Sequence, residues 1–310
     1  MKAARIEGYG GKDVLRIMDT PKPRPGRGQV LVEVRAAGVN PFDWKVREGM
    51  VRGMAELELP ATLGGDVAGV ITEIGEGVTD FEPGQAVYGQ AGALSGEGSF
   101  AEYTAVKVSQ LSAKPQSLDF VQAASLPLAA ASAYQALVDH MHLQKGRKIL
   151  IHGAAGGIGS IAVQLAKHLG AYVAATASAE DGSFVKGLGA DEVIDYHDQD
   201  FTEIIKDYDD VFDTVGGETN TKSYAVLRPG GILVSMTGGP DDELVKKYQI
   251  EYVAQASRTT QARLEAVAGL VDSGAIKPQV AKVFPLDQAA EALEYQKTGK
   301  PEGKVVIRVR

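Results

Sequence analysis

The sequence predicts an α/β protein in which a doubly wound parallel sheet is joined to a second, β-rich domain. Three observations give this prediction. A strand, a glycine-rich turn, a helix and a second strand follow one another between Lys148 and Ser178. Strand and helix patterns continue to alternate after this segment, which is typical of parallel sheets. Residues 1 to about 120 instead contain short β-branched runs between Gly and Pro turns, as small barrels and sandwiches do.

The elements are predicted in chain order from these patterns. Gln29–Arg35 and Val67–Ile74 are expected strands of the β-rich part. In the second half we expect strands at Lys148–His152, Tyr172–Thr176, Glu192–Asp195, Asp209–Asp213, Ile232–Ser235 and Ile250–Ala254, and helices at Gly157–Leu169, Asp181–Leu188 and Thr260–Ser273. Two late strand-like pieces, Gln279–Phe284 and Lys304–Val309, are expected to rejoin the first domain. The predicted domains are therefore 1–122 with 275–310, and 123–274.

Composition limits the classes of function. A net charge of −8 argues against nucleic acid as a partner. The chain has no cysteine, which excludes disulfides, cysteine nucleophiles and thiolate-bound zinc. No signal peptide is evident at the start, so a cytoplasmic location is predicted. Phe120–Val138 carries no charge and has the length of a membrane span, but Pro127 and its Ala, Ser and Gln content favour buried helices. We therefore expect no membrane association.

The loop after the strand Lys148–His152 is the strongest functional signal. It reads Ala154-Ala155-Gly156-Gly157-Ile158-Gly159, with alanine where the first glycine of a GxGxxG motif would stand. Glycines at a strand-to-helix turn let backbone amides approach a pyrophosphate, and the helix N-terminus adds a positive dipole end. The flanking strand and helix strengthen the motif. Ala155, Gly156, Gly157 and Ile158 are thus predicted to bind a dinucleotide; the alternative is a tight turn that binds nothing.

The residue that selects between NADH and NADPH is predicted at the end of the second strand. NAD-binding sites usually place a carboxylate there for the ribose hydroxyls, but this chain has Ser178. A neutral hydroxyl leaves room for a 2′-phosphate, which favours NADPH. Lys186 is a candidate cation for that phosphate, or a solvated helix residue. Tyr196 is a candidate to bond the phosphate or cover the adenine, or a half-buried ring. The acids Glu180–Asp181 lie nearby and count against NADPH.

Several motifs in this order resemble the medium-chain dehydrogenase/reductase superfamily, and specifically its zinc-independent NADPH:quinone oxidoreductase branch. The resemblance covers essentially the whole chain. It implies a GroES-like catalytic domain, a Rossmann cofactor domain, a small-molecule substrate bound in the cleft between them, and a homodimer. The motifs are Ala37–Asp43, Gly64–Val70, Gly98–Tyr103, Gly153–Gly159, Asp213–Gly217 and Gly303–Val306.

The departures from the zinc-containing members concern the metal ligands. In the positions of their catalytic zinc ligands this chain has Asn40, Gly65 and Leu128, and the cysteines of the structural zinc lobe are absent. The five histidines show no ligand spacing. The resemblance therefore predicts an enzyme without a metal.

The resemblance also assigns residues to the reaction. Asn40 would donate to the substrate carbonyl oxygen or fix the nicotinamide; alternatively it orders the turn before Pro41. Lys45 would bond the substrate oxygen or supply a proton; alternatively it pairs with Glu48 or Asp43. Asp66 is expected to close a structural hydrogen-bond network.

On the cofactor side, Ser132 matches the small hydroxyl residue near the nicotinamide ribose, and Thr214, Val215 and Gly216 should line the nicotinamide. Lys304 would reach the cofactor, or be a charged residue of an edge strand.

The function predicted from these residues is NADPH-dependent hydride transfer to quinones or α,β-unsaturated carbonyls. Without a Lewis acid the acceptor must already be electron-poor, and donors aimed at the developing oxyanion then suffice. Two alternatives remain. One is an enoyl-thioester reductase, against which the loop 88–98 counts because it lacks Lys and Arg. The other is a non-catalytic NADPH-binding redox sensor on the same fold.

Overall fold

The computed structural model describes residues 1–54 and 56–310, and the contacts within the chain divide it into two compact units. Unit 1 comprises Met1–Leu128, Thr259–Asp272 and Pro278–Arg310, and unit 2 comprises Ala129–Arg258 and Ser273–Lys277. This division differs from the predicted one mainly in helix α9 (Gln261–Asp272), which packs on β8 (Leu111–Ala113) of unit 1. Side-chain bonds hold α9 there, because the Tyr88 hydroxyl donates to Leu264 O and Asp272 accepts from Ser117 N.

Unit 2 contains a six-stranded, fully parallel sheet in the order β11-β10-β9-β12-β13-β14. This is the doubly wound order whose direction reverses between β9 and β12. All six strands predicted in this half are present. They are β9 (Lys148–His152), β10 (Tyr172–Ala177), β11 (Glu192–Asp195), β12 (Tyr208–Asp213), β13 (Leu227–Ser235) and β14 (Glu251–Ala254).

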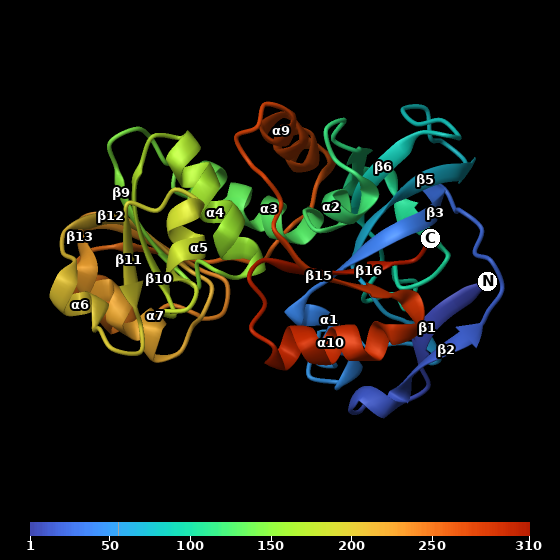
Figure 1. Cartoon of the computed structure of the whole chain (residues 1–310), viewed down its shortest axis with the longest axis horizontal. Helices are drawn as coiled ribbons and strands as arrows, with labels where there is room; N and C mark the ends of the chain where they lie inside the picture. Colours follow the sequence, from blue (N-terminus) through green and yellow to red (C-terminus); the bar gives the residue numbers. More distant parts are fainter. Residues whose placement is uncertain (55) are drawn as a thin grey trace. The chain divides into compact units, whose positions relative to one another are not determined.

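Helices cover both faces of this sheet (Figure 1). Right-handed crossovers place α4 and α5 on one face, and place α6, α7 and α8 on the other because the strand order runs the opposite way after β9. The core between the layers is built from aliphatic and aromatic side chains such as Val211, Tyr224 and Leu233. The helices are α4 (Gly157–His168), α5 (Gly182–Gly187), α6 (Phe201–Ile204), α7 (Glu218–Ser223) and α8 (Asp242–Tyr248), preceded by α3 (Pro127–Tyr134) and a π-helical turn (Gln135–His140).

Unit 1 is β-rich, as predicted. Its larger sheet has the order β15-β16-β3-β5-β6-β8, with β7 also paired to β3, and a smaller sheet has the order β2-β1-β4. The late segments do rejoin this unit: β16 (Lys304–Arg308) pairs antiparallel with β3 (Gln29–Val39), and β15 (Val280–Pro285) pairs with β16. The remaining strands are β1 (Lys2–Ile6), β2 (Leu15–Asp19), β4 (Ala61–Thr62), β5 (Asp66–Ile74), β6 (Ala86–Gln90) and β7 (Tyr103–Lys107).

Two helices of unit 1 were not predicted. They are α1 (Pro41–Arg47) and α10 (Ala289–Thr298), which pack against each other, and α10 also contacts β15 and β16. The sequence at the start of α1 does carry a helix-start signal. Pro41 stands at the first helical position, and the main-chain N–H of Asn40 donates to Asp43 Oδ2 at 2.7 Å. Short α2 (Phe120–Ala124) completes the helices of this unit.

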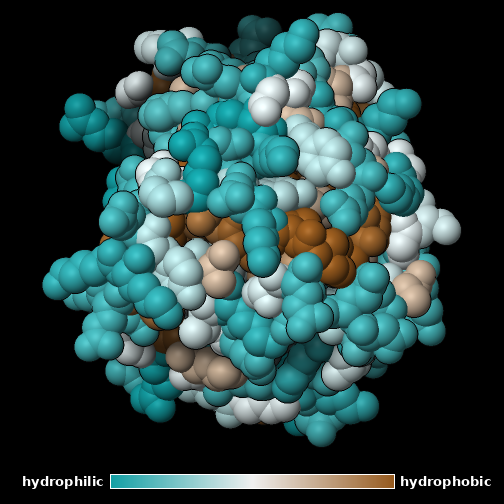
Figure 2. Space-filling model, turned by 90° about the vertical axis from the view of Figure 1, so that its left-hand side faces the viewer, coloured by the Kyte–Doolittle hydropathy of each residue, from teal (hydrophilic) through white to brown (hydrophobic). Residues whose placement is uncertain are grey.

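The charge-free stretch Phe120–Val138 is divided among α2, α3 and the π-helical turn, most of whose residues are buried. No helix formed by residues 1–54 and 56–310 is long and apolar enough to cross a membrane. The end of unit 2 that carries α6 is mostly hydrophilic, with a short band of hydrophobic side chains across it (Figure 2).

Candidate functional site

The turn between β9 and α4 is shaped by glycine. Gly153 has a φ of +68°, and a Cβ on Gly159 would lie 2.2 Å from Gly153 O, so a side chain there would force the helix away from the strand end. The N-cap Gly156 supplies no side-chain cap. Because the first amides of a helix have no intrahelical acceptor, those of Gly157 and Ile158 are available to an anion. The structure thus places the predicted pyrophosphate loop at an uncapped helix N-terminus.

The ends of β9 and β12 are joined beside this loop. The Thr214 hydroxyl donates to His152 O at 2.8 Å. The Asp213 carboxylate is fully buried and accepts from Val215 N at 2.9 Å and from Gly216 N at 3.0 Å. Asp213 therefore fixes the predicted nicotinamide segment Thr214–Gly216 at the carboxyl edge of the sheet, where ligands of such sheets bind. Its motif was noticed in the sequence, but its role in holding the turn was not.

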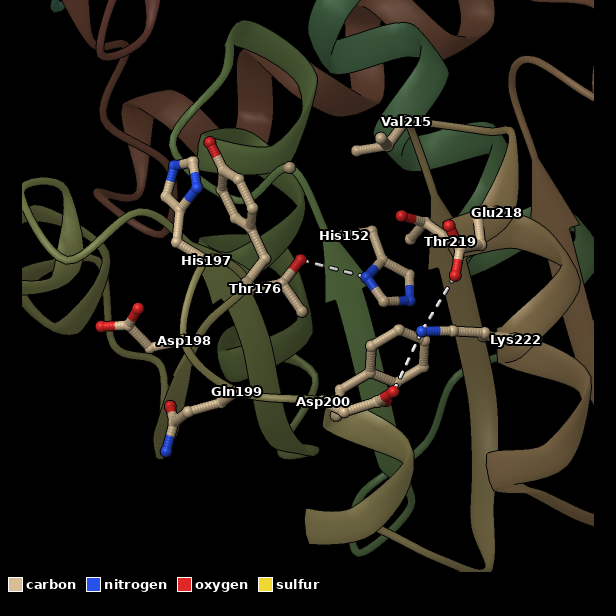
Figure 3. A pocket seen from close by; sticks show the side chains of 13 residues that line it. His152, Thr176, His197, Asp198, Gln199, Asp200, Val215, Glu218, Thr219 and Lys222 are labelled. Atoms are coloured by element: carbon tan, nitrogen blue, oxygen red, sulfur yellow. Dashed lines mark hydrogen bonds and ion pairs between the residues drawn. The ribbon is translucent and has the colours of Figure 1, made fainter.

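A pocket of about 610 Å³ opens at this edge within unit 2 (Figure 3). Tyr196 follows β11 and Val215 follows β12, and both line the pocket with half of their surface exposed. Lys222 also lines it and lies 3.0 Å from Asp200 and 3.1 Å from Glu218, so its charge is balanced locally. A flat, largely neutral ring suits these walls better than a phosphate does.

His152 forms the floor of this pocket and is held neutral. The Ser223 hydroxyl donates to Thr219 O, so it must accept from His152 Nε2 at 3.0 Å. The other ring nitrogen then accepts from the Thr176 hydroxyl at 3.0 Å. Burial lowers the pKa of His152 to about 4. The ring is a fixed part of the wall and not an acid or base at neutral pH.

A second hollow, of about 490 Å³, lies at the end of β10 and is lined by Ser178 and Lys186, both predicted to contact the 2′-phosphate. The Ser178 hydroxyl donates to Asp181 Oδ2 at 2.7 Å, and Lys186 Nζ donates to Asp191 O at 2.5 Å. Both predicted residues therefore border one hollow, but each is bonded to another group of the chain. Asp181, one of the two acids that count against NADPH, thus brings its carboxylate into direct contact with Ser178.

Ser132, on α3, is buried. Its hydroxyl oxygen lies 2.6 Å from that of Ser257, and its carbonyl accepts from Gln255. The predicted nicotinamide residue thus belongs to a polar cluster next to the carboxyl end of β14.

A buried polar network lies in unit 1 around Asp66, as predicted. Asp66 accepts from Asn40 Nδ2 at 2.9 Å and from Leu128 N at 3.0 Å. Lys304 Nζ donates to Val39 O at 3.0 Å and to Asn40 Oδ1, and lies 3.5 Å from Asp66 Oδ2. Lys304 is therefore no exposed edge residue. Its ammonium is a buried counter-ion, and the three groups it faces all belong to unit 1.

Asn40 has a defined amide orientation because of these contacts. Its Oδ1 accepts from Lys304, which assigns the nitrogen to the side of Asp66. One Nδ2 proton goes to Asp66, which leaves the other without an acceptor within this network. The turn before Pro41 is ordered by the backbone of Asn40 and not by its side chain, because Asp43 N donates to Asn40 O at 3.0 Å.

The alternative salt bridges of Lys45 do not form. Glu48 forms ion pairs with Arg47 and Lys297, each at 2.7 Å. Asp43 is buried, and its carboxyl accepts a hydrogen bond from the main-chain N–H of Asn40. The ammonium of Lys45 instead lies 5.6 Å from the ring of Trp44.

Burial sets the protonation of the two carboxyls in this network. Desolvation raises the pKa of Asp43 to about 7, aided by the nearby charge of Asp66 and opposed by the hydrogen bond from Asn40. Desolvation also raises the pKa of Asp66, against the attraction of Lys304. One ammonium, which contacts only Asp66, must offset two nearby carboxyls, and this favours a proton on Asp43 near neutral pH.

The raised pKa of Asp43 predicts how stability depends on pH. Between about pH 4 and pH 7 the folded protein holds a proton that the unfolded chain has lost, so the free energy of unfolding falls as pH rises through this window, by on the order of 4 kcal/mol in total. In Asp43→Asn the contribution of this carboxyl to the decline is expected to disappear, because the side chain no longer titrates, while an amide oxygen can still accept from Asn40 N. Urea denaturation at pH 4.5 and pH 7.5 measures it.

The matched control is Asp19→Asn, which removes an exposed carboxylate 3.8 Å from Lys2. In this variant the free energy of unfolding should still fall with rising pH as it does in wild type. A decline of the same size in Asp43→Asn would contradict the prediction.

The site residues do not fit zinc. Among residues 1–54 and 56–310, no three His, Cys, Asp or Glu side chains are grouped closely enough to hold a metal. Of the three positions that hold the ligands in zinc-containing members, Gly65 and Leu128 have no ligand atom and Asn40 bonds to Asp66. The ammonium of Lys304 adjoins Asn40 and would repel a cation.

The fold and these sites together define a dinucleotide-binding oxidoreductase with a doubly wound cofactor unit and a β-rich second unit. Residues 26–116 match the family described as alcohol dehydrogenase GroES-like domain, and residues 188–307 match the family described as zinc-binding dehydrogenase. The chain belongs to the medium-chain dehydrogenase/reductase superfamily, in its quinone and alkenal oxidoreductase branch.

Three relatives illustrate the membership. An NADPH-dependent alkenal/one oxidoreductase, chloroplastic, of Arabidopsis thaliana is 38% identical over 317 residues, covering 99% of this chain and 79% of the relative. The structure of the quinone oxidoreductase from Coxiella burnetii has a TM-score of 0.92 at 34% identity, covering 100% of this chain and 99% of that one. The Escherichia coli quinone oxidoreductase complexed with NADPH has a TM-score of 0.90 at 27% identity, with both chains fully covered.

Proposed function

We propose that this oxidoreductase uses NADPH to reduce quinones or the carbon–carbon double bond of α,β-unsaturated carbonyls, without a metal. The observation that carries the proposal is the Asn40 amide, which is oriented by two buried charges and keeps one N–H for a ligand. The relatives named as alkenal/one and quinone oxidoreductases support the substrate class.

The cofactor would be held entirely by residues of unit 2. The amides of Gly157 and Ile158 would bind the pyrophosphate, the side of the pocket formed by Tyr196 would take the adenine, Thr214–Gly216 would line the nicotinamide, and Ser178 and Lys186 would bind the 2′-phosphate. When bound, NADPH supplies the hydride. The glycines of the loop fit this role because they let the helix N-terminus lie close to the strand end, where a side chain on Gly159 would clash with Gly153 O.

The chain's own part in the reaction is electrostatic. Hydride addition to an electron-poor acceptor places negative charge on a carbonyl oxygen, and a preorganised donor lowers that barrier. The free Nδ2 proton of Asn40 is this donor. Lys304 and Asp66 hold the amide so that it does not have to reorient. Lys45, which has no carboxylate partner at Asp43 or Glu48, is the candidate proton source.

An assay with three acceptors tests the proposal. NADPH absorbance is followed with phenanthrenequinone, with a short enal and with crotonyl-CoA. We expect turnover with the first two and little with the thioester. Turnover of crotonyl-CoA alone would support the enoyl-thioester reductase instead. NADPH binding without oxidation by any acceptor would support the redox sensor, and elemental analysis showing one zinc per chain would refute the metal-free mechanism.

Cofactor preference is expected to depend on Asp181, because its carboxylate is bonded to Ser178 where a 2′-phosphate would lie. Asp181→Asn should tighten NADPH binding about three- to tenfold and leave NADH binding nearly unchanged, since one partly screened repulsion is removed. Titration of both cofactors by fluorescence measures the ratio.

Glu180→Gln is the matched control, because it removes a neighbouring exposed carboxylate that forms no bond with Ser178. Ser178→Asp should shift the ratio toward NADH. Equal ratios in wild type, Asp181→Asn and Ser178→Asp would refute this assignment of the 2′-phosphate. The homodimer, the cytoplasmic location and the absence of nucleic-acid partners stay predictions.

A further inference from the structure

One buried side-chain oxygen at the carboxyl edge of the unit 2 sheet lacks a partner. Gln255 follows β14 directly, and its main-chain amide donates to Ser235 O at 2.8 Å. Its side chain is only 6% exposed. Nε2 donates to Ser132 O at 3.0 Å and contacts Met236 Sδ at 3.2 Å, whereas Oε1 is buried without any hydrogen bond.

The orientation of this amide is not ambiguous. Ser132 O can only accept, so the nitrogen of Gln255 must face it and the oxygen must face away. Among the described side chains of unit 2, Gln255 Oε1 is the one buried polar atom left unsatisfied; the others in the chain belong to unit 1. A buried carbonyl oxygen without a donor is costly, and a bound ligand is one source of the missing donor.

The position of Gln255 identifies that ligand's chemistry. In a doubly wound sheet a dinucleotide lies across the carboxyl edge, with one mononucleotide half on each side of the point where strand order reverses. The adenosine features, Ser178 and Tyr196, are on the β10 and β11 side. The other half must then extend over β12, β13 and β14, where Gln255 lies.

We propose that Gln255 Oε1 accepts a hydrogen bond from the carboxamide NH₂ of the nicotinamide ring. The carboxamide is the only amide donor in that half of the cofactor, and this bond would set the rotation of the ring and hence the face that it presents. The inference rests on the proposed function, since it requires that a nicotinamide cofactor binds.

The test compares three ligands by isothermal titration calorimetry: NADP⁺, its 3-acetylpyridine analogue, in which a methyl ketone replaces the carboxamide, and 2′,5′-ADP, which has no nicotinamide. Wild type is expected to bind NADP⁺ roughly tenfold more tightly than the acetyl analogue, the effect of one hydrogen bond to an otherwise unsatisfied acceptor. In Gln255→Met this ratio should fall to about one, with 2′,5′-ADP binding unchanged.

Gln135→Met is the matched control. Gln135 is also buried in unit 2, but its Oε1 accepts from Arg258 N at 3.0 Å and its Nε2 donates to Ala256 O at 3.2 Å. Its ratio should stay that of wild type. The inference is overturned if wild type binds NADP⁺ and the acetyl analogue equally well, or if the ratio of the two affinities is unchanged in Gln255→Met. The first of these outcomes is measured on wild type and does not require the variant to fold. Failure of all three ligands to bind refutes the proposed function instead.

Discussion

Replacing Asn40 by alanine is expected to lower kcat about 100- to 1,000-fold, the usual effect of removing one donor to a developing oxyanion. The dissociation constant for NADPH should change little, because the proposed cofactor contacts all belong to unit 2. Steady-state kinetics with a quinone and with an enal measure the first quantity, and fluorescence titration measures the second.

Asp43→Asn is the control for this experiment. It changes the charge of the same buried network and keeps the Asn40 amide in place, so most of kcat should remain. If Asn40→Ala retains wild-type kcat, or loses activity only because NADPH no longer binds, Asn40 is not the donor.

Lys304→Met is expected to reduce the free energy of unfolding by about 3–5 kcal/mol at neutral pH, because a buried carboxylate then loses its counter-ion. The loss should shrink as pH falls, since Asp66 can take up a proton and become neutral. Kinetics of the same variant should show a lower kcat, because Asn40 Oδ1 loses the donor that orients it. Urea denaturation between pH 5 and pH 8 checks the stability.

Two further variants isolate the charge pair. Lys304→Met with Asp66→Asn removes both charges and should recover most of the lost stability. Lys297→Met breaks an ion pair with Glu48 at the surface and should cost less than about 1 kcal/mol. Equal losses in Lys304→Met and Lys297→Met would show that Asp66 does not depend on its counter-ion.

Local patterns in the sequence were sufficient to predict the cofactor unit. Parallel strands buried on both faces read as continuous β-branched runs, so β9 to β14 were all located within a few residues. The β9–α4 loop was equally predictable, because the close approach of Gly159 to Gly153 O leaves no space for a side chain.

The sequence was less informative where side chains from distant segments meet. The resemblance placed Lys304 near the cofactor, which stays a prediction, but it did not show what the ammonium contacts within the protein. The pairing of β16 with β3 shows that the ammonium meets Asn40. Similarly, the bond between Ser178 and Asp181 was not predicted, because the conformation of the turn after β10 decides whether that carboxylate faces the serine. The unsatisfied oxygen of Gln255 had no sequence signal at all.

The pairing of β16 with β3 has a consequence for how the protein is made. Lys304 follows every residue of unit 2 along the chain, so a ribosome releases Asn40 and Asp66 long before it releases their cation. Unit 2 is continuous apart from a short segment and can fold as a unit during synthesis. Until β16 is synthesised, the core of unit 1 is incomplete and its two buried acids, Asp43 and Asp66, have no lysine counter-ion. Strand β16, which follows the other described strands along the chain, therefore both pairs with β3 and brings the cation to Asp66.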